Sequence, residues 1–256
     1  DHPRIYRQVP AGFQVGLIVS ENEKDYPYKK LQDIPVIKQI LIEPPLILDP
    51  PMNKRKGFFS RANKNPLDLV NLNKEDFICY PAKVGDLVIH LFFNNKFIGL
   101  GCSLSNLFEL EEDLAKKPDA VYVYGINKDE IEGIAENTIV FYEDNENDIL
   151  VGAVPDNNEY GYFGYIKKMM LTLHNIICIK KGRMPIHGAM VKICLKNGKK
   201  ANVIIVGDSG AGKSESLEAF RTLSKEYLRE MTIIFDDMGS LEITENGIKA
   251  YGTETG

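Results

Sequence analysis

The sequence predicts an α/β protein with a mixed sheet in its N-terminal part, because two kinds of segment alternate along its 256 residues. Short runs rich in β-branched and aromatic residues predict strands, and a few longer segments with apolar residues at helical spacing predict helices. A glycine-rich motif directly follows an apolar run late in the chain, which indicates a strand, a loop and a helix in succession. We therefore expect a mixed α/β domain over residues 1–182 and the start of a second domain over residues 183–256.

Six apolar runs predict the strands of the first domain. Residues 86–93 and 96–101 are separated by Asn94-Asn95 and predict a β-hairpin. The remaining runs are Phe13–Ser20, Ala120–Tyr124, Thr138–Tyr142 and Ile149–Val154. The proline-rich stretch of residues 35–51 can sustain neither long helices nor central strands, so we expect loops with short strands there.

Two segments predict helices in the first domain. In Ser105–Lys116, four apolar residues lie among acidic ones, and Pro118 closes the segment. In Tyr165–Ile179, the apolar residues follow helical spacing, and we expect this stripe to pack in the core. The second domain is predicted to contain, in order, a hairpin of Ala189–Leu195 and Asn202–Val206, a helix over Ser214–Leu228, a strand over Thr232–Phe235, and two strands, Leu241–Ile243 and Ile248–Tyr251, around a turn.

Composition limits the partners that we expect. A formal net charge of −5 and a pI near 5.5 argue against a nucleic-acid partner, which requires a basic face. The four cysteines show neither paired spacing nor zinc-ligand spacing, so reduced thiols in a cytoplasmic protein are the simplest interpretation. No apolar run approaches the ~18 residues of a membrane-spanning helix, and we expect no membrane partner.

Residues 207–214 match the phosphate-binding pattern G-x-x-x-x-G-K-[ST]. They read Gly207, Asp208, Ser209, Gly210, Ala211, Gly212, Lys213 and Ser214. The apolar run Val203–Val206 before them predicts a buried strand, and a helical stretch follows. In such a loop the backbone N–H groups surround phosphate oxygens, Lys213 neutralises the β- and γ-phosphates, and Ser214 ligates Mg²⁺. The motif predicts nucleotide binding; the alternative is a glycine-rich turn with a surface lysine.

Two further groups have residue types suited to metal chemistry. Asp236 and Asp237 follow the predicted strand Thr232–Phe235, where one carboxylate could hold the cation that bridges phosphates and the other could act as a base. The alternative is a strand end capped by aspartates. His187 lies just upstream of the hairpin that precedes the loop, and it is either a metal ligand or a structural histidine.

Taken together, these residues resemble ATP-dependent phosphoenolpyruvate carboxykinases over about residues 100–256. Tyr162-Phe-Gly-Tyr-Ile-Lys-Lys168 is similar to the Tyr-Ala-Gly-Glu-x-Lys-Lys segment of that family. Met-Pro-Ile-His187-Gly-Ala is similar to the family's Pro-x-His-Cys-Ser-Ala-Asn, and the phosphate loop and the Asp236-Asp237 pair follow in the same order. The resemblance implies a carboxykinase-type nucleotide-binding domain, of which this chain would hold only the first part.

The resemblance also implies roles for individual residues. Lys168, His187 and Asp237 would hold Mn²⁺, while Lys213 and Ser214, the latter as a metal ligand, would bind ATP with Mg²⁺. Tyr162 would line the pocket for oxaloacetate or phosphoenolpyruvate. The implied reaction is decarboxylation of oxaloacetate to an enolate that captures the γ-phosphoryl group, with the metal as Lewis acid.

The sequence departs from that family in ways that leave two alternatives open. Tyr165 stands where the carboxykinases have glutamate, and Gly188-Ala189-Met190 replaces Cys-Ser-Ala-Asn. The loop with its following glutamate, together with His187-Gly188, resembles instead the related HPr kinase, which phosphorylates a serine of a small carrier protein. In that case Asp236 would deprotonate a hydroxyl. The remaining alternative is a non-catalytic ATP-binding module.

Overall fold

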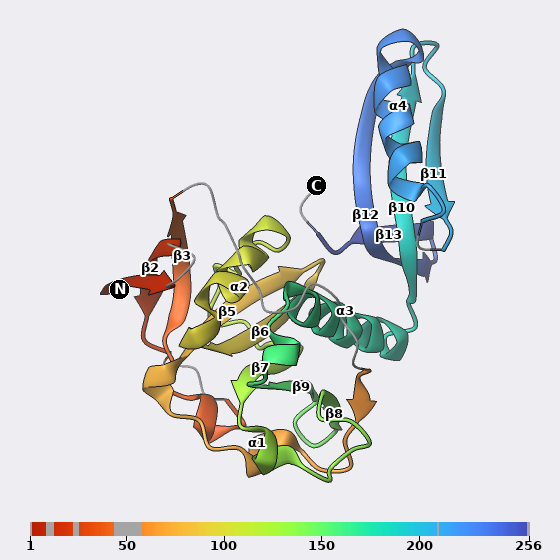
Figure 1. Cartoon of the computed structure of the whole chain (residues 1–256). Coiled ribbons are helices and arrows are strands. Elements are labelled where there is room, and N and C mark those ends of the chain that lie inside the picture. The colour runs from red at the N-terminus through yellow and green to blue at the C-terminus, as the bar shows by residue number, and fades with distance from the viewer. Residues whose placement is uncertain (1, 9–12, 23–25, 44–57, 209, 255–256) are drawn as a thin grey trace. The chain divides into compact units, whose positions relative to one another are not determined.

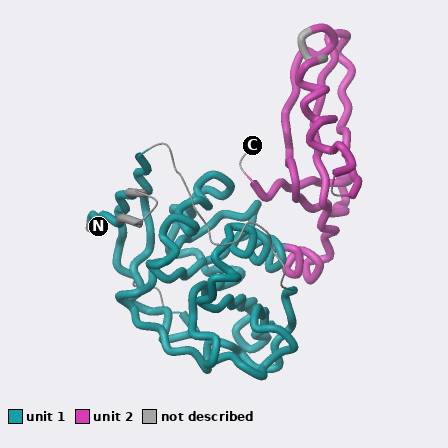
Figure 2. The backbone as a smooth tube through the Cα atoms, in the orientation of Figure 1, with its two compact units in different colours: residues 1–174 teal, residues 175–256 magenta. Residues whose placement is uncertain are grey.

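The computed structural model describes residues 2–8, 13–22, 26–43, 58–208 and 210–254 (Figure 1). The chain divides into two compact units, residues 1–174 and 175–256 (Figure 2). The boundary falls within helix α3 (Phe163–Lys180), whereas the sequence analysis put it after residue 182. Each unit contains its own sheet, and the predicted α/β class with a mixed N-terminal sheet is confirmed.

The first unit is built on a nine-stranded mixed sheet with the order β1-β2-β3-β5-β6-β7-β9-β8-β4. The strands are β1 (His2–Gln8), β2 (Phe13–Ser20), β3 (Val36–Ile42), β4 (Ser60–Arg61), β5 (Phe77–Val84), β6 (Leu87–Asn94), β7 (Ala120–Ile126), β8 (Val140–Asp144) and β9 (Ile149–Pro155). The pairs β6–β7 and β7–β9 are parallel, while β5–β6 and β8–β9 are antiparallel. The strands predicted at Phe13–Ser20, Ala120–Tyr124, Thr138–Tyr142 and Ile149–Val154 are confirmed within a few residues.

Short helices connect these strands. The α-helices before α3 are α1 (Pro66–Leu69) and α2 (Ile98–Cys102), and the 3₁₀ turns are η1 (Lys29–Leu31), η2 (Lys74–Asp76), η3 (Asn95–Phe97), η4 (Ser103–Asn106), η5 (Lys128–Ile131) and η6 (Asn158–Tyr160). Helix α1 and four of the 3₁₀ turns are each preceded by an asparagine whose side chain accepts a hydrogen bond from the N–H two residues later: Asn65, Asn73, Asn94, Asn127 and Asn157. No helix of the described residues is long and apolar enough to cross a membrane.

The middle of the first sheet is covered on both faces. Val121 and Val123 of β7 belong to the apolar cluster on one face. On the other face lies α3, and a Cβ added at Gly152 of β9 would stand 3.1 Å from the Met169 side chain. The glycine therefore lets the helix approach the sheet closely. The prediction of a helix over Tyr165–Ile179 with its apolar stripe in the core is confirmed.

The hairpin predicted around Asn94-Asn95 is wrong. The hairpin of the structure joins β5 to β6 through a turn at Gly85, which has a φ of 65°. Residues 96–101 instead form η3 and α2, because Asn94 caps η3 and the next turn packs on β6. A Cβ at Gly101 would lie 2.6 Å from the Phe93 ring, so this packing depends on a glycine.

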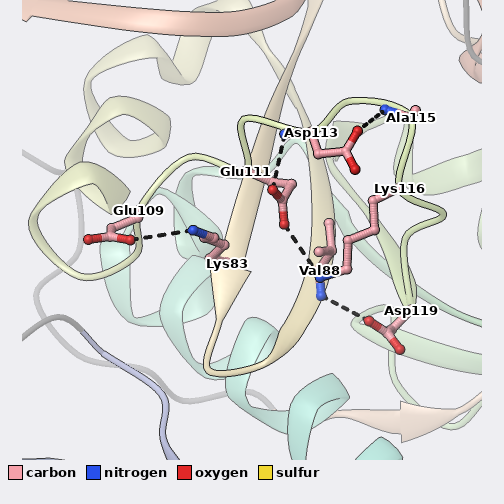
Figure 3. A network of polar contacts seen from close by, with 8 residues as sticks. All are labelled: Lys83, Val88, Glu109, Glu111, Asp113, Ala115, Lys116 and Asp119. Carbon is pink, nitrogen blue, oxygen red and sulfur yellow. Dashed lines mark hydrogen bonds and ion pairs between the residues drawn. The ribbon is translucent and has the colours of Figure 1, made fainter.

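The helix predicted over Ser105–Lys116 is also absent, since only η4 reaches into that segment. The acidic side chains bond to nearby groups instead of projecting from a helix: Glu111 accepts from the Asp113 N–H at 3.1 Å, and Asp113 accepts from the Ala115 N–H at 3.0 Å (Figure 3). The Glu111 N–H in turn donates to the Pro81 carbonyl, outside the segment. Local side-chain bonds of this kind compete with helix formation.

The second unit is a four-stranded antiparallel sheet with the order β11-β10-β12-β13. Its elements are β10 (Met184–Leu195), β11 (Lys200–Val206), α4 (Lys213–Tyr227), β12 (Leu228–Thr244) and β13 (Gly247–Gly252). Figure 1 shows α4 lying along β10, β11 and β12. Leu217 of α4 forms an apolar cluster with Ala189, Val191 and Ile193 of β10. Both predicted hairpins and the predicted helix are confirmed.

Two details of this unit differ from the prediction. The run Val203–Val206 is not a buried strand: β11 lies at the edge of the described sheet, and Val206 is 67% exposed. Only Val203 and Ile205 contribute to the cluster under α4. The strand expected to end at Phe235 instead continues to Thr244, because the later part of β12 pairs with β13. Asp236 and Asp237 therefore lie inside a strand.

Candidate functional site

The glycine-rich loop connects the end of β11 to the start of α4. Gly210 and Gly212 have φ values of 81° and 82°, a left-handed conformation that glycine adopts without steric cost. Apart from Gly210 and its two chain neighbours, no atom of the described residues lies within 4 Å of the position that a Cβ on Gly210 would take. The loop surface is therefore open at this point. Ser209, which belongs to the predicted loop, lies outside the described residues.

Lys213 lies across the start of the loop. Its Nζ donates hydrogen bonds to the carbonyl oxygens of Gly207 at 2.8 Å and Asp208 at 2.9 Å. Ser214, the next residue of α4, is exposed. A cation and the N-terminus of a fifteen-residue helix thus occur together at an open loop. Both favour an anion there, the helix through its unpaired N–H groups and its dipole.

The sheet register aligns this loop with the other candidate residues. In β10, Gly188 pairs with Val206 of β11 on one side and with Asp237 of β12 on the other. Val206 is the last residue before the loop, so the loop leaves the sheet level with His187, Gly188 and Asp237. This row brings together three segments that are far apart in the sequence.

His187 and Asp237 are in direct contact. His187 Nε2 lies 3.1 Å from Asp237 Oδ1, and the side chains are 45% and 28% exposed. The pair can form a hydrogen bond or, with a protonated imidazole, an ion pair. Asp237 has a φ of 118°, which is strained for any residue but glycine. Asp236, paired with Ala189, is exposed. The sheet therefore presents one paired and one exposed carboxylate beside the loop.

The remaining predicted site residues belong to the first unit. Tyr162 immediately precedes α3, where its ring centroid lies 6.4 Å from that of Tyr165. Lys168 is a partly buried residue of α3. The structure thus brings His187 and Asp237 together in the second unit, and the roles of Tyr162 and Lys168 at that pair stay predictions.

The donor types determine which groups these residues fit. The left-handed glycines and Lys213 fit a phosphate group. An imidazole nitrogen and a carboxylate oxygen fit a divalent cation such as Mn²⁺. However, the described residues contain no group of three or more His, Cys, Asp or Glu side chains that could hold a metal ion. A cation at His187 and Asp237 would therefore need further ligands of another kind.

Sequence reasoning missed the importance of Gly188. A Cβ on this residue would stand 2.5 Å from the Ile205 carbonyl oxygen, so only glycine fits between β11 and β12 at this level. A glycine inside a strand pattern is the available signal, because it often marks a close backbone approach.

Comparison of the chain with protein-family models and with curated proteins found no match.

Proposed function

We propose that the second unit binds the phosphates of ATP together with Mg²⁺ and that the protein catalyses phosphoryl transfer. One observation carries the proposal: the row Val206, Gly188, Asp237 aligns the glycine-rich loop with the His187–Asp237 pair. A phosphate at the loop would have Lys213 and the α4 N-terminus on one side and carboxylates two strands away. This combination suits a transferred phosphoryl group with a bridging cation.

The reaction that the sequence resemblance favours is conversion of oxaloacetate and ATP to phosphoenolpyruvate, ADP and CO₂. The bond to the leaving carboxylate breaks, its electron pair forms the pyruvate enolate, and the enolate oxygen attacks the γ-phosphorus as ADP leaves. A divalent cation would supply Lewis acidity for the enolate. Of the chain's own residues, Lys213 would hold the phosphates, His187 and Asp237 with Lys168 would hold the cation, and Tyr162 would line the pocket.

A second candidate is a kinase of the HPr-kinase type, and one observation favours it. The loop, His187, Asp236 and Asp237 all belong to the second unit, so transfer to a serine hydroxyl requires no residue of the first unit. Asp236 is exposed and could accept the hydroxyl proton. The two candidates share the nucleotide and differ in the acceptor.

Binding of ATP tests the shared part of the proposal. Lys213→Ala should weaken Mg²⁺-ATP binding in calorimetry at least tenfold, about 1.4 kcal/mol, because the main cation of the loop is removed. Arg221→Ala is the matched control, since Arg221 is an exposed cation on the same helix that pairs with Glu218. Equal ATP affinity of wild type and Lys213→Ala would contradict nucleotide binding at this loop.

Lys168→Arg distinguishes the two acceptors. Lysine ligates a metal only as the neutral amine, and arginine keeps the charge but does not deprotonate. For a carboxykinase, the variant should lose Mn²⁺-dependent, oxaloacetate-dependent ATP consumption and keep Mg²⁺-ATP binding. Unchanged Mn²⁺ affinity of the variant, measured by electron paramagnetic resonance, would remove the carboxykinase-type site and favour the kinase.

A further inference from the structure

The backbone of Asp237 is strained, and strain of this kind needs a cause in its surroundings. A non-glycine residue with a φ of 118° is energetically unfavourable and persists only where neighbouring contacts fix it. On one side these contacts come from β10, where Gly188 pairs with Asp237 and His187 pairs with Met238. The contacts on the other side come from the end of β13.

Gly252 and Thr253 hold β12 on both sides of the aspartate pair. A Cβ on Gly252 would lie 2.1 Å from the Ile234 carbonyl oxygen, so the end of β13 packs directly on the backbone before Asp236. Thr253, which is 3% exposed, donates from Oγ1 to the Met238 carbonyl oxygen at 2.8 Å. The segment from Ile234 to Met238 is thus fixed at both ends, with the two aspartates between.

The hydroxyl of Thr253 makes the stronger of the residue's two hydrogen bonds to the Met238 carbonyl oxygen. The Thr253 N–H also donates to the same carbonyl, but at 3.4 Å, beyond the usual N–H···O range. Removal of the hydroxyl would therefore leave the Met238 carbonyl with only the long hydrogen bond from Thr253. The strain at Asp237 could then be released by rotation of its backbone.

We propose that Thr253 is a positioning residue that holds Asp237 in the strained conformation in which its carboxylate meets His187. The inference rests on the proposed function and deepens it, because it gives the His187–Asp237 pair a preformed geometry for a divalent cation. The glycine-rich loop follows a different strand, β11, and its conformation does not depend on this contact. Loss of the Thr253 hydroxyl should therefore affect the cation far more than ATP.

Thr253→Val and Thr253→Ser form the matched pair for the test. Valine keeps the shape of threonine without the hydroxyl, and serine keeps the hydroxyl. In the full protein, Thr253→Val should weaken Mn²⁺ binding at least tenfold by electron paramagnetic resonance and change Mg²⁺-ATP affinity less than twofold, and Thr253→Ser should restore Mn²⁺ affinity. Equal Mn²⁺ affinity in wild type and Thr253→Val would overturn the inference, while nucleotide binding would stand.

A double-mutant cycle of unfolding free energies with Asp237→Gly tests the contact of Thr253 with Met238, here called the clamp, without any ligand. Glycine adopts a φ of 118° without strain, so Asp237→Gly should raise the midpoint of urea unfolding. Thr253→Val should then lower the unfolding free energy less in the wild-type background than in the Asp237→Gly background. In wild type, loss of the clamp also relieves the backbone strain of Asp237, whereas glycine has no such strain to relieve. Equal losses in the two backgrounds would contradict the clamp. Unequal losses in a protein that binds neither Mn²⁺ nor ATP would support the clamp and reject the proposed function.

Discussion

Strands β7 and β11 contain similar β-branched residues but lie in different environments. Every residue of β7 is buried, because α3 covers one face of its sheet and an apolar cluster covers the other. In β11 no residue is buried, and Ile204 and Val206 are exposed. Continuous apolar runs are typical of strands covered on both faces. Among the described residues, the run that ends in Val206 is covered by α4 on one face only.

This difference in burial accompanies a difference in the chemical groups of the two units. In the first unit, burial raises the pKa of the Cys102 thiol to about 12, which leaves it protonated and unreactive at neutral pH. In the second unit, the open glycines, the strained Asp237 and the half-exposed His187 cluster where the sheet meets the loop. We infer that the first sheet mainly provides stability, while the second carries the groups suited to ligands.

The largest expected effect contrasts one core residue with one edge residue. Phe92→Ala removes a fully buried ring from β6 and should cost about 3–5 kcal/mol of unfolding free energy. Ile204→Ala removes a side chain that is 38% exposed on β11 and should cost less than about 1 kcal/mol. Urea unfolding of both variants measures the contrast. Similar losses would mean that β11 is covered as completely as β6.

Replacement of one glycine in each sheet by alanine should give a smaller contrast in unfolding free energy. Gly188→Ala would place a Cβ 2.5 Å from the Ile205 carbonyl oxygen and should cost about 1–3 kcal/mol by forcing backbone shifts. Gly16→Ala on β2 would place its Cβ at an ordinary 3.6 Å from Leu41 and should change stability by less than about 1 kcal/mol. The midpoints of urea unfolding measure this contrast. A Gly188→Ala variant as stable as wild type would show that the row Val206, Gly188, Asp237 is loosely packed.

The smallest expected effect concerns the pH dependence of folding stability and arises from Asp144 in the first unit. Burial alone would raise the pKa of Asp144, but hydrogen bonds from Tyr28, at 2.5 Å, and from Asn147 lower it below its usual value of about 3.9. A lowered pKa in the folded state means that Asp144 stabilises the fold above about pH 4 and that this contribution is lost as the pH falls through the folded-state value.

Tyr28→Phe should therefore cost about 1–2 kcal/mol at pH 7, since a bond to a carboxylate is removed. Its acid unfolding, followed by circular dichroism, should also begin at a higher pH than that of wild type. Tyr142→Phe on β8 is the control, because Tyr142 is only partly buried in the same cluster. Coincident acid transitions of Tyr28→Phe and wild type would show that Tyr28 does not set the pKa of Asp144.

Local patterns predicted part of the candidate site. The glycine-rich loop, its lysine and the following helix are contiguous in sequence, and the two hairpins of the second unit carry turn signals between their strands. Prediction failed where a segment's partners come from elsewhere. Residues 105–116 have helical spacing, yet Glu111 bonds to Pro81 and local carboxylate bonds replace helical ones. Tertiary contacts outweigh propensities that are worth only tenths of a kcal/mol per residue.

By itself, the sequence determined the mixed α/β class, strands β2, β6, β7, β8 and β9 of the first sheet, helix α3 and the position of the glycine-rich loop between a strand and a helix, because each depends on residues adjacent along the chain. Only the tertiary structure decided that Val206 is exposed, that Gly188 must be glycine and that His187 meets Asp237. These facts follow from strand register, which joins residues far apart in sequence and leaves no local pattern. The positive φ of Asp237 belongs with them, since the contacts that surround it come from β10 and, through Met238, from Thr253 rather than from a local sequence pattern.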